Sequence, residues 1–357
     1  MSTLWIWLKR VALLLVLAIG AGAAYGGYLS YAPADLGLEG KPTVAPAPGP
    51  EASQDGALTY RFLGNTNLLI SDGETSLLTD GWFSRFSTRT LMLGRIAPDL
   101  DAIQAGLERA EIDRLAAVIP VHSHFDHAMD SPEVAKRTGA LLVGSSSSAN
   151  IARGWGLPEA FIRVARSGEP MRFGAFTVTL IDSKHFPFPS EFAREQAGLG
   201  QAIEQPLFTP AAPSDYKEGV SYSVLIEHPE ATLLIQGSAG FVEGALDGLD
   251  VDLLFLGIGG LGSQTEAYRR AYWAEVADAV RPEVIVPIHF DSLTAPLADE
   301  LTPPSRLWSE ALGLMAEKSI RDFEALAAEA GAPVFFPELW VQVPVRAALD
   351  AASARPR

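Results

Sequence analysis

The chain has 357 residues, of which 48% are hydrophobic and 20% charged, which is ordinary for a globular protein and unlike a disordered one. Its net charge of −16 disfavours a nucleic-acid partner, because an acidic surface repels phosphate backbones. With no cysteine, it can form no disulfide, no cysteine-ligated zinc or iron–sulfur site, and no lipoprotein anchor.

Residues 1–31 read as a membrane anchor or a signal segment. Lys9 and Arg10 precede an uncharged run over residues 11–29, close to the roughly 20 residues that span a bilayer as a helix. Positive charge before the run predicts that the body lies on the exported, periplasmic or extracellular, side. Ala21–Ala23 fits a signal-peptidase site, which leaves a soluble exported protein as the alternative. We favour the uncleaved anchor, because the apolar run continues past that site.

Two further stretches are predicted to lie outside the folded domain. Residues 32–57 are rich in proline, alanine and glycine and predict a semi-extended linker between the membrane and the domain. Residues 346–357 predict a frayed C-terminal tail.

Residues 58–345 alternate strand-like and helical patterns, which predicts one α/β domain with partly antiparallel sheets. Helices are predicted over residues 99–110, 131–139 and 265–280; in the third, Tyr268, Tyr272, Val276 and Val280 share one face. Strands are predicted over residues 58–64, 66–71, 76–80, 114–121, 140–145, 175–183, 221–228, 232–237, 251–259 and 283–290.

A weak internal repeat links two of the predicted hairpins. Residues 67–81 align without gaps on residues 223–237, with six identities, and each copy reads as strand, polar turn, strand and glycine. The repeat indicates two related halves packed face to face, although any two buried hairpins share leucine and isoleucine.

The stretch "VHSHFDHAMD" over residues 121–130 holds three of the six histidines. His122, His124, Asp126 and His127 follow a continuous apolar run that reads as a buried strand. Imidazole nitrogens and carboxylate oxygens suit zinc, iron or manganese, and so many imidazoles are unfavourable side by side without a metal. A metal site is therefore favoured over a polar loop with a core histidine.

This H-x-H-x-D-H pattern after a buried strand resembles the metallo-β-lactamase superfamily, over essentially all of residues 58–345. The resemblance implies a four-layer αββα sandwich of two pseudo-equivalent halves. Asp80, His185 and His289 match further motif positions, whereas His228 reads as an exposed residue that is not a ligand. The stretches "DLLFLGIGG" and "PIHF" look most like the branch of ascorbate-6-phosphate lactonase and N-acyl-phosphatidylethanolamine phospholipase D.

The resemblance also implies the ligand sets of two divalent metal ions, zinc first and manganese or iron as alternatives. The first ion would take His122, His124 and His185, the second Asp126, His127 and His289, with Asp80 bracing the histidine loop. The family's bridging aspartate is replaced by Ser238 in "GS". The second site would then hold three protein ligands and water, which is acceptable for catalysis, and a single-metal enzyme becomes an alternative.

The implied function is metal-dependent hydrolysis, in which a metal-bound hydroxide attacks an ester, lactone or phosphodiester. Asp126 would orient the hydroxide and Ser238 would hydrogen-bond to it. Residues 186–220 form a long segment that reads either as an apolar lid over a small-molecule or lipid-like substrate or as a disordered insertion. The alternatives are a non-catalytic, membrane-tethered binding protein and an iron-dependent enzyme of the same fold. No oligomeric state is predicted.

Overall fold

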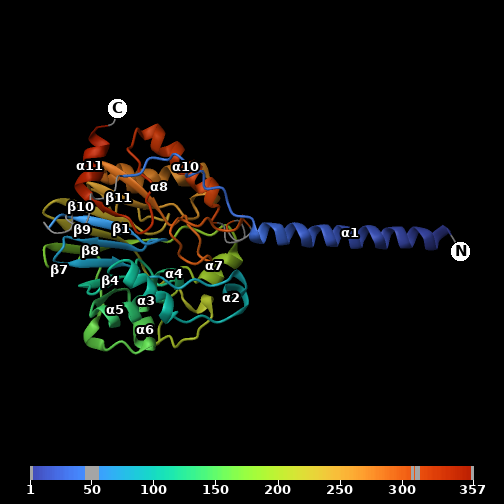
Figure 1. Ribbon diagram of the computed structural model, residues 1–357, viewed down its shortest axis with the longest axis horizontal. Helices are drawn as coiled ribbons and strands as arrows, with labels where there is room; N and C mark the ends of the chain where they lie inside the picture. Colours follow the sequence, from blue (N-terminus) through green and yellow to red (C-terminus); the bar gives the residue numbers. More distant parts are fainter. Residues whose placement is uncertain (1–2, 45–55, 307–308, 310–313, 355–357) are drawn as a thin grey trace.

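A computed structural model describes residues 3–44, 56–306, 309 and 314–354. Helix α1, Thr3–Tyr31, projects from a two-sheet body (Figure 1). Its segment Trp5–Tyr28 is long and apolar enough to cross a membrane, and none of it is buried. Length and composition are therefore those of a membrane anchor or of a signal sequence at the N-terminus.

The first sheet has the strand order β13-β1-β2-β3-β4-β5-β6. β1, β2 and β3 pair antiparallel, whereas β3 to β6 are parallel. The strands are β1 (Thr59–Phe62), β2 (Leu68–Ser71), β3 (Ser76–Thr79), β4 (Ala117–Ile119), β5 (Leu141–Gly144), β6 (Ile162–Val164) and β13 (Gln342–Pro344).

The second sheet has the order β12-β11-β10-β9-β8-β7 and mixes antiparallel and parallel pairs in the same way. Its strands are β7 (Pro170–Phe173), β8 (Phe176–Ser183), β9 (Ser221–His228), β10 (Ala231–Gln236), β11 (Leu253–Gly257) and β12 (Val284–Ile288). All ten predicted strands are confirmed. The prediction missed β6, β7 and β13, which are three or four residues long and lie at sheet edges.

Three apolar cores separate four layers. Between the sheets, residues of both inner faces interdigitate, as where Tyr60 meets Phe255 edge-on at 5.0 Å between ring centroids. The outer face of the first sheet packs on α3 (Leu100–Arg109), α5 (Ser131–Thr138) and α6 (Ser146–Trp155). The outer face of the second packs on α8 (Glu266–Trp273) and α10 (Ala316–Ala330). Helices thus cover both outer faces, as the αββα expectation requires.

All three predicted helices are present, as α3, α5 and α8, and side chains cap the N-termini of two of them. Asp99 accepts bonds from the first backbone N–H groups of α3, and Thr265 does the same for α8. Tyr272, Val276 and Val280 are buried, Tyr268 is half-buried, and a π-helical turn over Ala274–Asp278 extends α8. Among the described residues, the other α-helices of the body are α2 (Thr88–Leu93), α4 (Phe125–Ala128), α7 (Glu191–Ala197) and α11 (Val345–Ser353).

The internal repeat has the same register in both halves. Leu69 pairs with Leu78 and Ile70 with Leu77 in the first hairpin. Their aligned counterparts pair identically, Leu225 with Leu234 and Ile226 with Leu233. In each half the next strand then adds in parallel, β4 beside β3 and β11 beside β10. The alignment therefore reflects two equivalent units rather than shared strand composition.

The predicted free linker differs from the structure over residues 32–44. Ala34, Leu36 and Val44 are buried in the cores, and Ala34 N–H donates to Pro304 O at 2.8 Å. Apolar residues spaced among the prolines hold this stretch on the body. Residues 45–55 of the predicted linker lie outside the described residues.

The predicted frayed tail is wrong for residues 346–354. β13 pairs with β1, and α11 buries Ala348 and Leu349 against the inter-sheet core. A tail with an apolar residue on each turn of one helical face can pack in this way. Residues 355–357 lie outside the described part of the chain.

The prediction that His228 is exposed is also wrong. Its side chain is 6% exposed, and its Nε2 lies 3.6 Å from Asp72 Oδ2. The ring packs on Phe176, with centroids 4.9 Å apart. His228 is the last residue of β9, next to the turn that joins β9 to β10. Asp72 lies in the turn that joins β2 to β3, so the two turns, one from each sheet, contact each other through this pair. It belongs to neither ligand group.

Candidate metal centre

The predicted ligands come together at the carboxyl ends of strands from both sheets. His122, His124, Asp126 and His127 follow β4, while His185 follows β8 and His289 follows β12. His289 has a positive φ of 61°, a conformation unusual for a side-chain-bearing residue and frequent at functional sites. A Cβ at Gly259 would lie 2.6 Å from His289 Nδ1, so the glycine leaves room for this ring.

The first group consists of His122, His124 and His185, whose ligand atoms lie within 4.8 Å of one another. His122 Nε2 and His124 Nδ1 are 3.0 Å apart. The second nitrogens of two rings are held by backbone carbonyls: His124 Nε2–H donates to Ala197 O at 2.8 Å and His185 Nδ1–H to Phe186 O at 2.9 Å. These bonds select the tautomers whose remaining nitrogen has a free lone pair.

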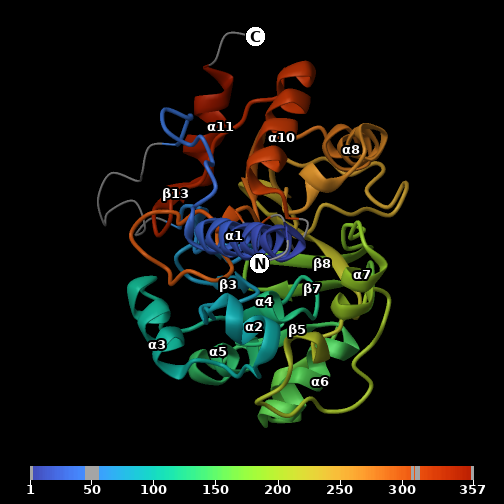
Figure 2. The ribbon, with the colours of Figure 1, turned by 90° about the vertical axis from the view of Figure 1, so that its right-hand side faces the viewer.

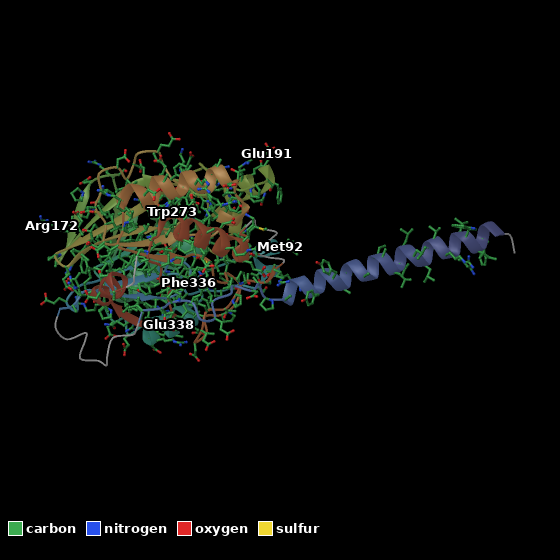
Figure 3. The ribbon with its side chains drawn as sticks, turned by 90° about the horizontal axis from the view of Figure 1, so that it is seen from above. Met92, Arg172, Glu191, Trp273, Phe336 and Glu338 are labelled. Atoms are coloured by element: carbon green, nitrogen blue, oxygen red, sulfur yellow. The ribbon has the colours of Figure 1, made fainter. Side chains whose placement is uncertain are left out.

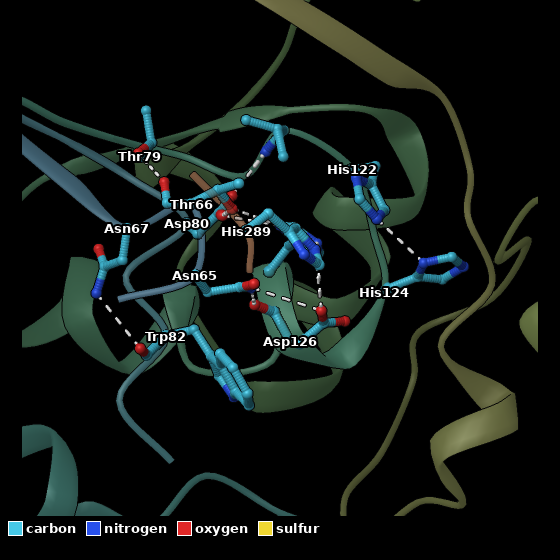
Figure 4. A network of polar contacts seen from close by, with 12 residues as sticks. Asn65, Thr66, Asn67, Thr79, Asp80, Trp82, His122, His124, Asp126 and His289 are labelled. Atoms are coloured by element: carbon cyan, nitrogen blue, oxygen red, sulfur yellow. Dashed lines mark hydrogen bonds and ion pairs between the residues drawn. The ribbon is translucent and has the colours of Figure 1, made fainter. Parts of the chain in front are cut away.

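The second group consists of Asp126, His127 and His289. His127 Nε2 lies 3.2 Å from His289 Nε2. Asp126 Oδ2 lies 3.4 Å from His127 Nε2 and 3.6 Å from His289 Nε2. Figure 4 shows Asp126 facing His289 across this small space.

This triangle fits a transition metal. Zinc at about 2.0–2.1 Å from each ligand in tetrahedral geometry separates neighbouring ligand atoms by about 3.3–3.4 Å. The sides of the triangle, 3.2, 3.4 and 3.6 Å, bracket that separation. Two imidazoles and one carboxylate are also the donor types that zinc, iron and manganese accept. The residues present therefore fit a divalent ion.

The two groups are neighbours, because the rings of His122 and His127 lie 3.9 Å apart between centroids. Burial, with the neighbouring imidazoles, lowers the pKa of His122 and His185 well below its usual value. Burial alone would raise the pKa of Asp126, yet His127 and His289 draw it below its usual range. For His122, His185 and Asp126 these shifts favour the forms that bind a metal, a neutral imidazole and an ionised carboxylate.

Asp80 braces the histidine loop. Its carboxylate is fully buried, and Oδ2 accepts a bond from His127 Nδ1 at 2.8 Å while Oδ1 accepts one from Val121 N–H at 2.9 Å. Thr66 Oγ1 also donates to Oδ2. A carboxylate behind a ligating histidine fixes the ring and makes its other nitrogen a better ligand.

The sequence did not single out Asn65, which joins the two ligand-bearing loops (Figure 4). Its Nδ2 donates to Asp126 O at 2.7 Å, and its carbonyl accepts a bond from His289 N–H at 2.9 Å. Asn65 has a φ of 57°, which asparagine tolerates better than most residues. Asn65 is the one residue between two predicted strands, within "GNTN" over residues 64–67, and this break was the signal that could have indicated it.

Glu218 is a second residue that the sequence did not single out. It is buried, and its Oε1 accepts bonds from His185 N–H at 3.0 Å and from Ser221 Oγ at 2.8 Å. Oε2 accepts a bond from Gly200 N–H at 2.8 Å. Glu218 therefore ties the segment of residues 186–220 to the first ligand group.

Ser238 is buried beside the first group. Its Oγ accepts a bond from Phe186 N–H at 3.1 Å, one residue from His185. Its carbonyl accepts a bond from Gln236 Nε2 at 2.9 Å. The hydroxyl keeps its own hydrogen to donate.

No protein-family model matches the chain. A UPF0173 metal-dependent hydrolase of Myxococcus xanthus is 26% identical over 234 residues, covering 63% of this chain and 75% of that protein. One of Pyrobaculum islandicum is 25% identical over 238 residues, covering 66% and 85%.

Solved structures that superpose in part on this one include that of Igni18, a metallo hydrolase of Ignicoccus hospitalis. It has a TM-score of 0.46 and 15% identity, covering 80% of this chain and 97% of that one. The metallo-beta-lactamase fold protein YhfI of Bacillus subtilis has a TM-score of 0.46 and 14% identity, covering 81% and 99%.

Proposed function

We propose that this protein is an enzyme, a metal-dependent hydrolase of the metallo-β-lactamase superfamily. The observation that carries the proposal is the triangle of Asp126, His127 and His289, whose sides match the ligand spacing of a tetrahedral ion. The similarity to UPF0173 metal-dependent hydrolases supports the enzyme class.

We assign one divalent ion to each ligand group, with zinc as the first candidate. Bound there, such ions lower the pKa of water toward neutrality and polarise a carbonyl or phosphoryl oxygen. The chain's own residues prepare this chemistry. Asp80 keeps the ring proton of His127 on Nδ1. The carbonyl of Ala197 holds the ring proton of His124 on Nε2, and the carbonyl of Phe186 holds that of His185 on Nδ1, so the other nitrogen of each ring can bind an ion.

Asp126 and Ser238 are the proposed catalytic residues. The Asp126 carboxylate has a second oxygen with which to orient an attacking water, and Ser238 retains a free O–H to donate to it. The proposed substrate is an ester, lactone or phosphodiester with apolar parts. Phe186 and Phe188 support this, because both rings lie against His185, at 4.4 and 5.2 Å between centroids.

We further propose that α1 anchors the protein in a membrane. The span Trp5–Tyr28 and its full exposure support an anchor. By the positive-inside rule, Lys9 and Arg10 would stay on the cytoplasmic side of the membrane. The body, at the other end of α1, would then lie on the exported side.

The test is elemental analysis of the full chain beside two variants. Two metals per chain, with one lost in His124→Ala, is the expected result, and hydrolysis of esters, lactones and phosphodiesters should fall with the metal. One metal in the natural chain and two in Ser238→Asp would replace the proposal by a single-metal centre. No metal in folded protein supplied with zinc and manganese would overturn it.

A further inference from the structure

Four apolar side chains outside α1 stand out from the surface. Among the described residues there, the most exposed large hydrophobic side chains are Met92 (68% exposed), Leu93 (83%), Phe192 (72%) and Phe208 (71%). The others that are exposed reach no more than 45%. Exposed apolar side chains mark a contact surface where they lie together in one patch.

These four side chains come from two neighbouring parts of the chain. Met92 and Leu93 end α2, Phe192 lies on α7, and Phe208 lies in the same long segment as α7. Ile96 and Ala211 exchange two backbone hydrogen bonds, of 2.7 and 2.9 Å, which join the chain after α2 to the chain after Phe208. We call Met92, Leu93, Phe192 and Phe208 the apolar rim.

The α2 and α7 members of the apolar rim, Met92, Leu93 and Phe192, lie on the side of the body from which α1 emerges. Figure 2, viewed along α1, shows α2 and α7 on the near side of the body, below and beside the helix. Figure 3 places Met92 close to the base of α1 and Glu191, the first residue of α7, at the same end, with Arg172 at the opposite end.

The junction between α1 and the body leaves almost no slack. Ala32 N–H still bonds to Tyr28 O at 2.7 Å, and Ala34 N–H already bonds to Pro304 O at 2.8 Å. Arg306 N–H donates to Ala32 O at 2.9 Å. The 24 residues Trp5–Tyr28 extend about 36 Å as a helix, enough for a hydrocarbon core of about 30 Å. A bilayer spanned by α1 therefore ends against this side of the body.

Local charge favours the same partner. Residues 81–98 contain three arginines and no acidic residue, in a chain whose net charge is −16. Arg89 and Arg95 are exposed beside Met92 and Leu93. Arginines next to exposed apolar side chains suit a surface of anionic headgroups over acyl chains. The positive charge comes from the α2 side, because α7 carries Glu191 and Glu195.

We propose that the apolar rim inserts into the bilayer that α1 spans, so that lipid contacts the segment covering the metal centre. The inference rests on the proposed anchoring by α1 and deepens the proposed function. Helix α7 links the two places, because Phe192 points outward while Ala197 O, at its other end, accepts the bond from His124. The substrate is then a molecule held in the leaflet, and it reaches the first ligand group past α7.

The absence of cysteine makes the test direct. Single cysteines at Leu93→Cys, Phe192→Cys, Arg172→Cys and Leu15→Cys are labelled with an environment-sensitive fluorophore in the full chain. The protein is reconstituted in vesicles of phosphatidylcholine and phosphatidylglycerol, with and without spin-labelled lipid. Arg172, exposed on β7 at the far end, is the matched control, and Leu15 reports on α1.

The expected result is a blue shift and lipid quenching at positions 93, 192 and 15, with neither at 172. Quenching at position 15 alone would overturn the inference and leave the anchor intact. No quenching at position 15 would remove the anchor and the inference together. The metal content of the same samples reports separately on the proposed metal centre.

A second measurement tests delivery of the substrate. The double variant Leu93→Asp, Phe192→Asp should keep its metal content and its rate on a water-soluble ester. Its rate on an ester held in the vesicles should fall about tenfold, because the two charges weaken the contact with lipid. A tenfold fall corresponds to about 1.4 kcal/mol. Equal losses on both esters, or none on either, would contradict entry from the leaflet.

Discussion

Replacing Asp80 by asparagine tests whether the brace behind His127 controls metal binding. The natural carboxylate accepts bonds from His127 Nδ1–H, Val121 N–H and the Thr66 hydroxyl in a fully buried position. Asparagine has the same shape but only one acceptor oxygen. Its NH₂ group must therefore face either His127 or the backbone of Val121, donor against donor.

Two effects of about the same size are expected. A buried donor without an acceptor costs about 1–3 kcal/mol of folding free energy. Loss of the group behind a ligating histidine typically lowers metal affinity about 10–100-fold, or about 1.4–2.7 kcal/mol. The second group should lose affinity, because His127 belongs to it, while the first group should change little.

The assay is zinc titration of the metal-free protein against a chromophoric chelator, beside urea unfolding of the same samples. Asp72→Asn is the matched control, because Asp72 is also buried and lies 3.6 Å from a histidine, His228, outside both ligand groups. The control should lose stability without losing zinc affinity. Unchanged affinity in Asp80→Asn, or an equal fall in both variants, would refute the reasoning.

Three other substitutions test neighbouring parts of the structure. Glu218→Gln removes an acceptor next to His185 and should cost about 1–3 kcal/mol, seen as faster hydrogen exchange over residues 198–219; unchanged exchange would contradict its tying role. Asn65→Gly keeps the positive φ but removes the bond to Asp126, so zinc affinity of the second group should fall several-fold, with circular dichroism as the control for folding. Phe255→Ala leaves a cavity in the inter-sheet core and should lower the free energy of unfolding by about 3–5 kcal/mol. The folded protein should keep its metal, and loss of metal from folded protein would contradict this prediction.

The sequence predicted which candidate ligands lie together where these residues are close in the chain. His122, His124, Asp126 and His127 share six residues after an apolar run, so their meeting needed no knowledge of the fold. His185 and His289 were identified through the resemblance alone, because only strand order brings them near. Asn65 and Glu218 carry no such signal, since an asparagine in a turn and a glutamate in a long segment are common, and their roles depend on contacts across the sheets.

The fold was predicted best where apolar runs are long. β6 and β13 have three residues each, and β7 begins with proline, so none has a readable period. Composition misled over residues 32–44, because prolines hide the few apolar residues that pack on the body. Helix α11 was missed because two of its four buried residues, Ala348 and Ala352, are alanines, which give a weak apolar signal.

The pairing of β13 with β1 has a consequence for how the protein is made. β1 is among the first strands to leave the ribosome and β13 the last, so the edge of β1 stays unpaired while nearly all the rest is synthesised. At about 5–20 residues per second this is roughly a quarter of a minute to one minute. An open strand edge over that time invites pairing with other chains. Until β13 has been made, the edge of β1 is therefore a place at which the unfinished chain can pair with another chain.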